Sequence, residues 1–364
     1  MKNKDIESWF EKGENPLLIA GPCSAESEEQ LRKSIFPILE NTNFIRAGIW
    51  KPRTRPGNFE GAGEEGLKWL QNLRQERSFK IATEVATPEH VEISLKHQVD
   101  LLWIGARTTV NPFAVSELAE SLNGIDIPVL VKNPIHPELA LWKGAIERLT
   151  KAGIKKLGAI HRGFHAYQKT KYRNIPLWQI PLDLKSDFPD LPLLCDPSHI
   201  GGNRNMIFDI SQRALDLNYD GLMIETHYDP DQALSDPKQQ VTPNALLDII
   251  GNLQIRKTEF SKPFNKEQLS VIREQIDQAD HQLLEAIAKR LELVEQIGEF
   301  KQENNVAIFQ ISRWKEIFKS RQKWADEMDL DSKFIVDILR LLHQQSVKKQ
   351  TEVFNREETK TNNE

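Results

Sequence analysis

The sequence contains few cysteines and no long apolar run. Its 364 residues include two cysteines, Cys23 and Cys195, which are too few for a disulfide framework. Every apolar run falls far short of the roughly 18 residues that cross a bilayer, so we expect no transmembrane span. The opening residues Met1–Phe10 are charged and lack the apolar core of a signal peptide, which predicts a cytoplasmic protein.

The sequence also lacks a block of basic residues. It has 48 Lys and Arg against 53 Asp and Glu, a net charge of −5. Proteins that bind nucleic acid concentrate Lys and Arg to neutralise phosphates, so this balance argues against a nucleic-acid partner.

Helix-breaking residues are nearly missing from the C-terminal part of the chain. All 19 prolines lie at or before Pro263, and Gly298 is the one glycine beyond that point. Two architectures therefore share the chain. We predict a first domain at 1–251, a polar linker at 252–265, a helical domain at 266–354, and a charged tail at 355–364 that has nothing to bury and is expected to be frayed.

Before the linker, short apolar runs alternate with amphipathic stretches, a pattern typical of strands followed by helices. Eight runs in about 250 residues predict a (β/α)8 TIM barrel. A doubly wound sheet is the alternative, but the first run is not followed by the G-x-G-x-x-G dinucleotide fingerprint. The eight runs are Leu17–Ala20, Phe44–Ala47, Ile81–Val85, Leu101–Ile104, Val129–Val131, Leu157–Ile160, Leu193–Cys195 and Leu222–Ile224.

Polar side chains follow each run, at the end of a barrel where active sites form. Six of them are cations that suit phosphates and carboxylates: Arg46, Lys51, Arg53, Arg107, Lys132 and Arg162. Four others form a mixed soft and hard donor set that suits Mn, Fe, Co or Zn better than Mg or Ca: Cys23, His199, Glu225 and Asp236. Taken singly, Cys23, His199 and Glu225 are each more often structural than metal ligands. Four of them at one barrel mouth favour a metal site.

Several motifs of this region resemble 3-deoxy-arabino-heptulosonate 7-phosphate (DAHP) synthase, in its short type Iβ branch, over about Pro16 to Ile250. They are Gly21-Pro22-Cys23-Ser24, Lys51-Pro52-Arg53-Thr54, Gly105-Ala106-Arg107, Cys195-Asp196-Pro197-Ser198-His199 and Glu225-Thr226-His227. The resemblance implies a metal-dependent condensation of phosphoenolpyruvate with erythrose 4-phosphate. It implies that Cys23, His199, Glu225 and Asp236 bind the metal, that Arg107, Lys132 and Arg162 hold phosphoenolpyruvate, and that Lys51, Arg53 and Thr54 hold the aldose phosphate.

Related 3-deoxy-octulosonate 8-phosphate synthases are the competing interpretation. They carry Lys-Ala-Asn-Arg-Ser where this chain has Lys51-Pro52-Arg53-Thr54, and this departure favours the four-carbon sugar. A sialic acid synthase barrel is a further alternative. The group that delivers protons is not identified by the sequence, with Lys51 and Glu84 as candidates.

After the linker, apolar residues recur at spacings of three, four and seven, which predicts a long helix at 270–302. Further helices are expected at 312–327 and 332–353, forming an all-α unit of three helices. Arg290 and Lys301 share one face of the long helix, whereas Arg273 lies about 25 Å from Arg290. A small ligand at Arg290 could meet only the Arg273 of a second chain, so the spacing suggests a homodimer of antiparallel helices. A coiled-coil dimerisation arm with solvated charges is the alternative.

This segment is similar to the all-helical AroQ class of chorismate mutase over about Leu269 to Thr351. The positions that match its ligand-binding residues are Arg273, Arg290, Lys301, Arg313 and Gln350. The resemblance implies that Arg290 binds a carboxylate of chorismate, that Lys301 and Gln350 face its ether oxygen, and that Arg273 comes from the partner chain. The family's usual Asp and Glu are here Gln310 and Trp314, so a binding-only regulatory domain is an alternative. Fusion to the barrel predicts feedback by chorismate or prephenate.

Overall fold

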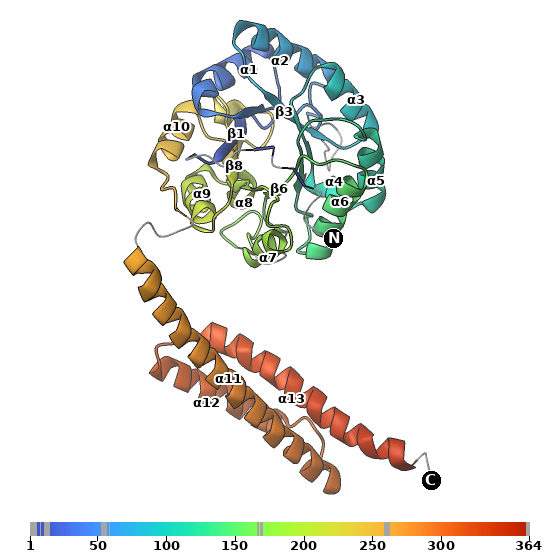
Figure 1. Cartoon of the computed structure of the whole chain (residues 1–364), viewed down its shortest axis with the longest axis vertical. Helices are drawn as coiled ribbons and strands as arrows, with labels where there is room; N and C mark the ends of the chain where they lie inside the picture. The colour runs from blue at the N-terminus through green and yellow to red at the C-terminus, as the bar shows by residue number, and fades with distance from the viewer. Residues whose placement is uncertain are drawn as a thin grey trace. The chain divides into compact units, whose positions relative to one another are not determined.

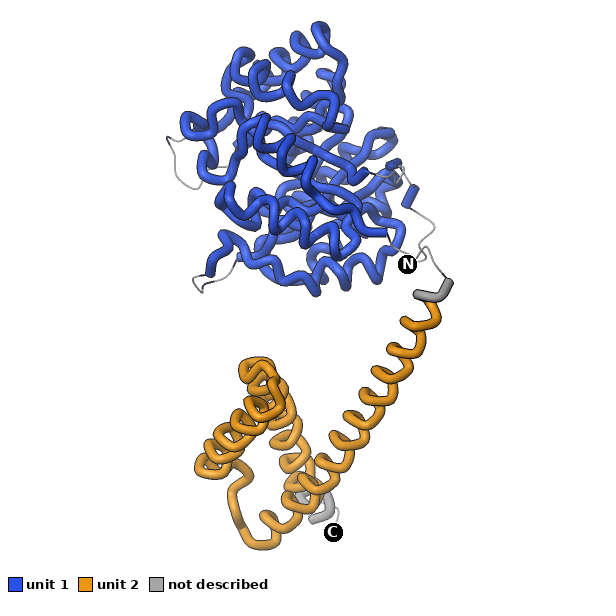
Figure 2. The backbone as a smooth tube through the Cα atoms, turned by 90° about the vertical axis from the view of Figure 1, so that its left-hand side faces the viewer, with its two compact units in different colours: residues 1–258 blue, residues 259–364 orange. Residues whose placement is uncertain are grey.

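The computed structural model describes residues 6–7, 9–10, 15–51, 57, 59–165, 167, 170–257 and 263–361, with side chains for all of these except 263–265 and 357–361. The described residues form two compact units, divided after Thr258. Figure 2 colours the two units separately.

The first unit is an eight-stranded closed barrel (Figure 1). Each strand pairs in parallel with the next along the chain, and β8 closes the barrel against β1. The predicted (β/α)8 fold is confirmed, and each strand begins and ends within about one residue of its predicted range. The strands are β1 Leu17–Gly21, β2 Phe44–Arg46, β3 Ile81–Val85, β4 Leu101–Ile104, β5 Val129–Lys132, β6 Leu157–His161, β7 Leu193–Cys195 and β8 Gly221–Glu225.

Helices surround the strands, as Figure 1 shows. The α-helices are α1 Glu28–Ile35, α2 Glu64–Glu76, α3 Pro88–Lys96, α4 Ala106–Thr109, α5 Pro112–Ser121, α6 Leu139–Lys151, α7 Gln179–Asp187, α8 Pro197–Gly201, α9 Ile207–Asp216 and α10 Pro243–Asn252. Short 3₁₀ turns are η2 Phe36–Asn41, η3 Arg204–Met206, η4 Pro230–Gln232 and η5 Pro237–Gln239.

Local sequence signals fix where these helices begin. Ser27 and Thr87 accept hydrogen bonds from the backbone N–H groups of Gln30 and His90, as N-cap residues do. Pro88 occupies the start of α3, where a backbone N–H is not needed. The loops after β1 and β3 therefore include a defined helix start.

The barrel has two apolar layers. One lies between the strands and the surrounding helices, and the other fills the barrel interior. The interior residues are Leu17, Ile19, Phe44, Ala82, Leu101, Trp103, Leu130, Ile160, Leu194 and Met223. At the N-terminal end of the strands Trp9 and Phe10 pack on this layer, and the Trp9 indole N–H donates to the Leu157 carbonyl oxygen at 2.7 Å. The opposite end is left for polar side chains.

The second unit consists of three helices, which confirms the predicted all-α architecture. They are α11 Pro263–Glu303, α12 Ile311–Glu327 and α13 Ser332–Thr361, and both α11 and α12 pack against α13. α11 begins seven residues before the predicted start at Ser270. α13 continues past Val353 to Thr361, into the segment expected to be frayed, and Arg356 pairs with Glu295 of α11 at 2.6 Å.

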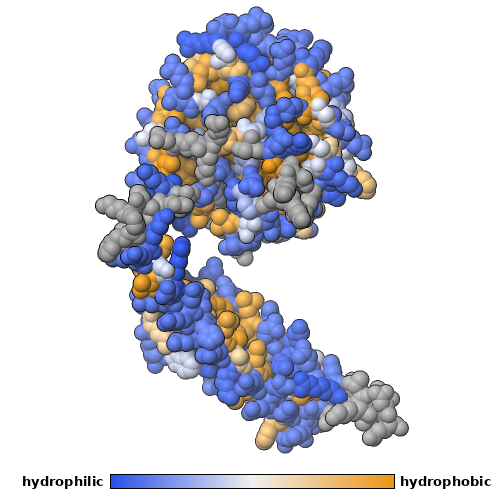
Figure 3. Space-filling view, in the orientation of Figure 1, coloured by the Kyte–Doolittle hydropathy of each residue, from blue (hydrophilic) through white to orange (hydrophobic). Residues whose placement is uncertain are grey.

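Much of the apolar surface of the helical unit is exposed (Figure 3). Val271, Ile272 and Ile276 on α11 are each 53% exposed, whereas Val294 in the second half of α11 is 7% exposed. Buried apolar side chains stabilise a helix by about 1.5–3 kcal/mol each, so the first half of α11 gains little from its own chain. None of the described helices in either unit has the length and apolarity of a membrane span.

Candidate functional site

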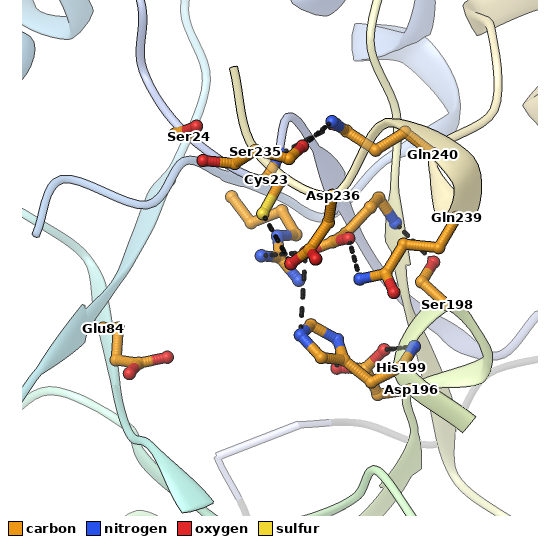
Figure 4. Close-up of polar contacts among 12 residues, drawn as sticks. Cys23, Ser24, Glu84, Asp196, Ser198, His199, Ser235, Asp236, Gln239 and Gln240 are labelled. Atoms are coloured by element: carbon orange, nitrogen blue, oxygen red, sulfur yellow. Dashed lines mark hydrogen bonds and ion pairs between the residues drawn. The ribbon is translucent and has the colours of Figure 1, made fainter. Parts of the chain in front are cut away.

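Three side chains from distant parts of the sequence meet at the C-terminal end of the strands. Cys23 follows β1, Glu225 ends β8, and Asp236 lies in the loop after β8. The Cys23 Sγ and one carboxylate oxygen from each acidic residue all lie within 4.8 Å of one another. Figure 4 shows the Cys23 and Asp236 side chains directed toward each other. The structure thus brings together three of the four predicted metal ligands.

Backbone geometry permits this close approach. Gly21 at the end of β1 has φ +142°, and a Cβ at this position would collide with the Arg46 carbonyl oxygen of β2. Asp236 has φ +46°, in the left-handed region that Asp adopts more readily than most residues. These two positions set the path of the chain on either side of the group formed by Cys23, Glu225 and Asp236.

His199, the fourth predicted ligand, lies beside this group. Its Nε2 is 3.9 Å from Glu225 Oε1, and its Nδ1 is 2.8 Å from Asp196 Oδ2. The His199 backbone N–H also donates to Asp196 Oδ1 at 3.0 Å. A carboxylate at one ring nitrogen fixes the orientation of the imidazole and leaves the other nitrogen for a ligand. The arrangement therefore directs Nε2 toward Glu225.

Burial and charge act in opposite directions on this group. Burial, together with the Glu225 carboxylate, raises the pKa of the Cys23 thiol to about 12. Burial would also raise the pKa of Asp236, but the charges of Arg173 and His199 outweigh it and lower this pKa to about 2. For Glu225, His199 and Arg46 likewise overcome burial and lower the pKa. Two ionised carboxylates thus lie beside a neutral thiol, a set of groups that a bound cation would stabilise.

Two of the predicted substrate-binding cations are buried and paired. Arg46 is 2% exposed, and its Nη2 lies 3.0 Å from Glu225 Oε1. Lys132 Nζ lies 2.9 Å from Asp196 Oδ2. Buried cations need such partners because an isolated charge in the interior is strongly unfavourable. Arg46 is therefore connected directly to the candidate ligand Glu225, and Lys132 is connected through Asp196 to His199.

Three other predicted cations of the barrel, Lys51, Arg107 and Arg162, lie among the residues that the structure describes. Lys51 Nζ donates to Cys23 Sγ at 3.1 Å, so this lysine contacts a candidate metal ligand directly. Burial, opposed by Asp196, lowers the pKa of Arg162 to about 10, and the charges of Arg173 and Arg107 act in the same direction as burial. Guanidinium groups that repel one another suit an anionic ligand. Arg53 and Thr54 lie outside the described residues.

Sequence reasoning missed Arg173 and Gln239, whose side chains contact the side chains of candidate metal ligands. Arg173 Nη1 donates to Asp236 Oδ1 at 2.9 Å and to Gln239 Oε1 at 2.5 Å, while Gln239 Nε2 donates to Glu225 Oε2 at 2.6 Å. Arg173 lies far along the loop after β6, so its distance from the strand end concealed it. A cavity of about 320 Å³ lies beside these residues, lined by Arg173, Gly202, Asp236, Pro237, Lys238 and Gln239.

In the helical unit, Arg290 on α11 and Gln350 on α13 lie where these two helices pack together. Arg290 Nη1 donates to Ser346 Oγ at 2.8 Å and to the Leu342 carbonyl oxygen at 3.3 Å. Gln350 is 7% exposed, and its Oε1 accepts no hydrogen bond from the residues that the structure describes. A buried acceptor without a donor is costly unless a ligand supplies one.

Lys301 acts on the same histidine as Arg290: burial, and then the charges of both residues, lower the pKa of His343. Lys301 Nζ donates to the Ile308 carbonyl oxygen at 2.5 Å, and burial lowers its pKa. Arg313 pairs with Glu316 at 2.8 Å on the exposed side of α12, and Arg273 is exposed on α11. Trp314 packs on His343, with ring centroids 3.6 Å apart.

The family comparison covers the barrel and the helical unit separately. The model of the DAHP synthetase I family matches residues 5–259. The chain belongs to this family. Residues 272–351 match the chorismate mutase type II model, so the chain joins a DAHP synthetase I barrel to a chorismate mutase domain of the AroQ type. The resemblances inferred from the motifs are confirmed for both units.

Two known proteins are similar in sequence to the barrel unit. A phospho-2-dehydro-3-deoxyheptonate aldolase of Thermotoga maritima is 31% identical over 225 residues, which are 62% of this chain and 64% of that protein. The chain thus spans less than two thirds of the length of this relative. A 2-dehydro-3-deoxyphosphooctonate aldolase of Wolinella succinogenes is 27% identical over 263 residues, 65% of this chain and 97% of that protein.

Two solved structures share the fold. The crystal structure of the Thermotoga maritima DAHP synthase aligns with a TM-score of 0.60 at 28% identity, covering 66% of this chain and 68% of that one. A truncated form of 3-deoxy-D-arabino-heptulosonate 7-phosphate synthase from the same organism aligns with a TM-score of 0.57 at 25% identity, covering 66% and 85%.

Proposed function

We propose that the chain is a cytoplasmic bifunctional enzyme of aromatic amino acid biosynthesis. Its barrel condenses phosphoenolpyruvate with erythrose 4-phosphate to give DAHP and phosphate, and its helical unit rearranges chorismate to prephenate. The observation that carries the first activity is the group of ligand atoms from Cys23, Glu225 and Asp236 within 4.8 Å of one another. The cations Arg46, Lys51 and Arg173 each contact one of these three residues. Family membership supports both activities.

The donor set fits a divalent transition metal. A thiol, two carboxylates and the nearby Nε2 of His199 combine soft and hard ligands, which suits Mn, Fe, Co or Zn better than Mg or Ca. When bound, the ion supplies Lewis-acid polarisation of the aldehyde carbonyl. Cys23, His199, Glu225 and Asp236 hold it, and the cations that contact these residues set the charge around it.

The cations of the barrel bind and orient two anions that repel each other. Arg107, Lys132 and Arg162 hold the phosphate and carboxylate of phosphoenolpyruvate, and Lys51, Arg53 and Thr54 hold the aldose phosphate. Fixing both molecules with C3 of the enol phosphate near the aldehyde carbon removes the entropic cost of their encounter. Lys132 is itself held by Asp196, so its ammonium is positioned before the substrate arrives.

The competing substrate is a five-carbon aldose phosphate, because a 2-dehydro-3-deoxyphosphooctonate aldolase is among the similar proteins. The tetrad Lys51-Pro52-Arg53-Thr54 favours the four-carbon sugar. Comparing kcat/KM for erythrose 4-phosphate and arabinose 5-phosphate tests the assignment. We expect a preference of at least about 100-fold for the four-carbon sugar. A preference for the five-carbon sugar would overturn it.

The helical unit binds chorismate between α11 and α13. Chorismate rearranges in one pericyclic step, so cations and hydrogen-bond donors that favour its compact transition state are sufficient for catalysis. Arg290 binds a carboxylate, and Lys301 and Gln350 face the ether oxygen. The buried and unpaired Oε1 of Gln350 supports a ligand at this position. Arg313 completes the cationic surroundings. Chorismate decay in the presence of the full chain, compared with its Arg290→Ala variant, tests the activity.

A binding-only helical unit is the second candidate, because Trp314 stands where the mutase family carries an acidic residue. Measuring prephenate binding by calorimetry alongside chorismate turnover separates the two. Tight binding without turnover would favour the regulatory interpretation, whereas turnover that Arg290→Ala abolishes would favour the enzyme.

The chain forms a homodimer through the helical unit. The exposed apolar residues Val271, Ile272 and Ile276 need a partner surface, and Arg273 lies on the same half of α11, about 25 Å from Arg290 along the helix. An antiparallel second α11 would cover the apolar residues and bring its Arg273 to this site. Sedimentation equilibrium should give twice the mass of one chain, and a monomer at micromolar concentration would contradict the proposal.

Prephenate or chorismate bound to the helical unit inhibits the barrel. Fusion of the two units makes such coupling available, and an effector acts only if it binds the two states of the protein differently. The full-length Arg290→Ala variant should lose inhibition of DAHP formation by prephenate, while Arg340→Ala, an exposed arginine paired with Asp337, should retain it. Inhibition that survives Arg290→Ala would refute this route.

A further inference from the structure

One aromatic side chain inside the barrel contacts three charged residues of the mouth. Trp103 lies on β4 and is 1% exposed. It belongs to the interior apolar layer, and its strand neighbours in register are Glu84 on β3 and Leu130 on β5. Lys132 is the next inward residue along β5. Trp103 is therefore an interior residue adjacent to the polar mouth.

Its indole N–H and its ring each bind a different kind of group. The N–H donates to Glu84 Oε2 at 2.8 Å, so the buried indole satisfies its one donor with a carboxylate. The guanidinium carbon of Arg46 lies 5.2 Å from the ring centroid, and Lys132 Nζ lies 5.7 Å from it. Both distances are within the range in which an aromatic face attracts a cation, and the attraction is larger when water is excluded.

The three charged residues are thus each held by more than one contact. Arg46 lies between Trp103 and Glu225, and Lys132 lies between Trp103 and Asp196. The Glu84 carboxylate also lies against Gly105, since a Cβ there would collide with Glu84 Oε1. An aliphatic residue of similar size would fill the barrel interior but could not bind either cation or donate to a carboxylate.

We propose that Trp103 is a positioning residue, whose indole fixes Lys132 in the geometry that binds the enol phosphate and holds Arg46 and Glu84 beside it. This inference rests on the proposed function of the barrel. Trp103 itself does not touch the reacting atoms. It acts through the residues that surround the substrate, and its effect should therefore appear mainly in the binding of phosphoenolpyruvate.

The test compares two substitutions of Trp103 with the same two substitutions of Trp142 in the full-length protein. Trp142 is also fully buried, and its indole N–H donates to the Val131 carbonyl oxygen at 3.0 Å, but it lies in the outer apolar layer. Trp103→Leu removes the ring and the donor, and should raise KM and Kd for phosphoenolpyruvate by roughly tenfold or more, given the usual strength of a desolvated cation–π contact. Trp103→Phe keeps an aromatic face and should restore part of this loss.

Thermal unfolding, KM for each substrate and phosphoenolpyruvate binding by calorimetry are measured for all four variants. Substitution of either tryptophan should lower Tm. Only the Trp103 variants should raise KM and Kd for phosphoenolpyruvate, and their KM for the aldose phosphate should change little. If the Trp103 and Trp142 variants have the same KM and Kd, the inference is wrong while the proposed function stands. A wild-type protein that neither binds phosphoenolpyruvate nor condenses it would refute the proposed function and, with it, this inference.

Discussion

The Asp196 carboxylate joins His199 to Lys132: its Oδ2 lies 2.8 Å from His199 Nδ1 and 2.9 Å from Lys132 Nζ. Asp196 is fully buried, and although burial would raise its pKa, His199 and Lys132 hold that pKa well below the usual range. One ionised carboxylate thus orients a candidate metal ligand and a cation of the proposed substrate site.

Replacing Asp196 by Asn should weaken both functions of the site. Loss of the charge that orients His199 should lower metal affinity by about 10- to 100-fold, as other substitutions of this kind do. KM for phosphoenolpyruvate should rise because Lys132 loses its partner. Metal titration followed by atomic absorption, together with steady-state kinetics, measures both effects.

Asp220→Asn is the matched control for this variant. Asp220 is a largely buried carboxylate that binds Lys185 at 2.9 Å and accepts from the Leu193 backbone N–H, away from the barrel mouth. Asp220→Asn should lower the free energy of unfolding without changing metal affinity. Equal metal affinity in both variants and the wild type would contradict the role assigned to Asp196.

The two cysteines provide a direct contrast. Cys23→Ala removes a proposed metal ligand and should reduce condensation by at least about 100-fold at limiting metal, because the ion then loses its soft donor. Cys195→Ala removes a thiol that is equally buried but lies in the outer apolar layer. It should keep metal-dependent activity and lower only Tm. A Cys23→Ala protein with wild-type metal affinity would be incompatible with the site.

In the helical unit, Lys301→Ala should reduce chorismate turnover more than it reduces binding. Its ammonium is proposed to stabilise charge at the ether oxygen in the transition state, and the loss of such a donor costs about 100-fold in kcat. Lys289→Ala is the control, since Lys289 lies on the same helix and pairs with Glu292 on the exposed side. Kinetics of chorismate disappearance provide the readout, and identical kcat values for the two variants would argue against this role.

Stability of the barrel should decrease in mild acid because of His161. Burial lowers the pKa of this histidine to about 3, well below the unfolded value of 6.5. The unfolded chain therefore binds a proton below about pH 6.5 that the folded chain does not, so this contribution is present above pH 6.5 and is lost as pH falls toward 3. Between pH 7.5 and 5.5 the free energy of unfolding should fall by about 1.4 kcal/mol through this group.

Denaturant unfolding of the wild type and His161→Leu at the two pH values measures this effect. The variant removes the titrating ring, which contacts Tyr219 Oη at 3.0 Å, and should be less stable at both values. The test lies in the pH dependence, which should be smaller in the variant by about 1.4 kcal/mol. Equal pH dependence in both proteins would show that His161 is not buried in its neutral form.

The order of strands and the position of the mouth could be predicted from the sequence, because each apolar run is followed by its own polar residues. Cys23 and Glu225 were identified in this way, as residues at strand ends. The contacts of Trp103 could not be predicted. In a parallel strand buried on both faces every residue is apolar, so no alternation shows that Trp103 faces inward while Leu102 faces outward.

Contacts between distant residues and the ends of helices could also not be predicted from the sequence. Arg173 contacts Asp236 only because the loop after β6 folds toward the loop after β8. α13 continues beyond Val353, and Arg356 in this stretch pairs with Glu295 on α11, a contact that depends on how the two helices pack. Apolar periodicity identifies the packed part of a helix, whereas polar residues beyond it gain stability from partners that spacing does not reveal.

The most direct test of the central claim is phosphoenolpyruvate consumption with erythrose 4-phosphate before and after removal of metal. The full-length protein is treated with a chelator, dialysed and assayed, then assayed again with added Mn²⁺. We expect consumption to stop in the stripped protein and to return with Mn²⁺, and neither to occur in a Cys23→Ala, His199→Ala double variant. Full activity in the stripped protein, or in the double variant, would contradict a metal held by Cys23, His199, Glu225 and Asp236.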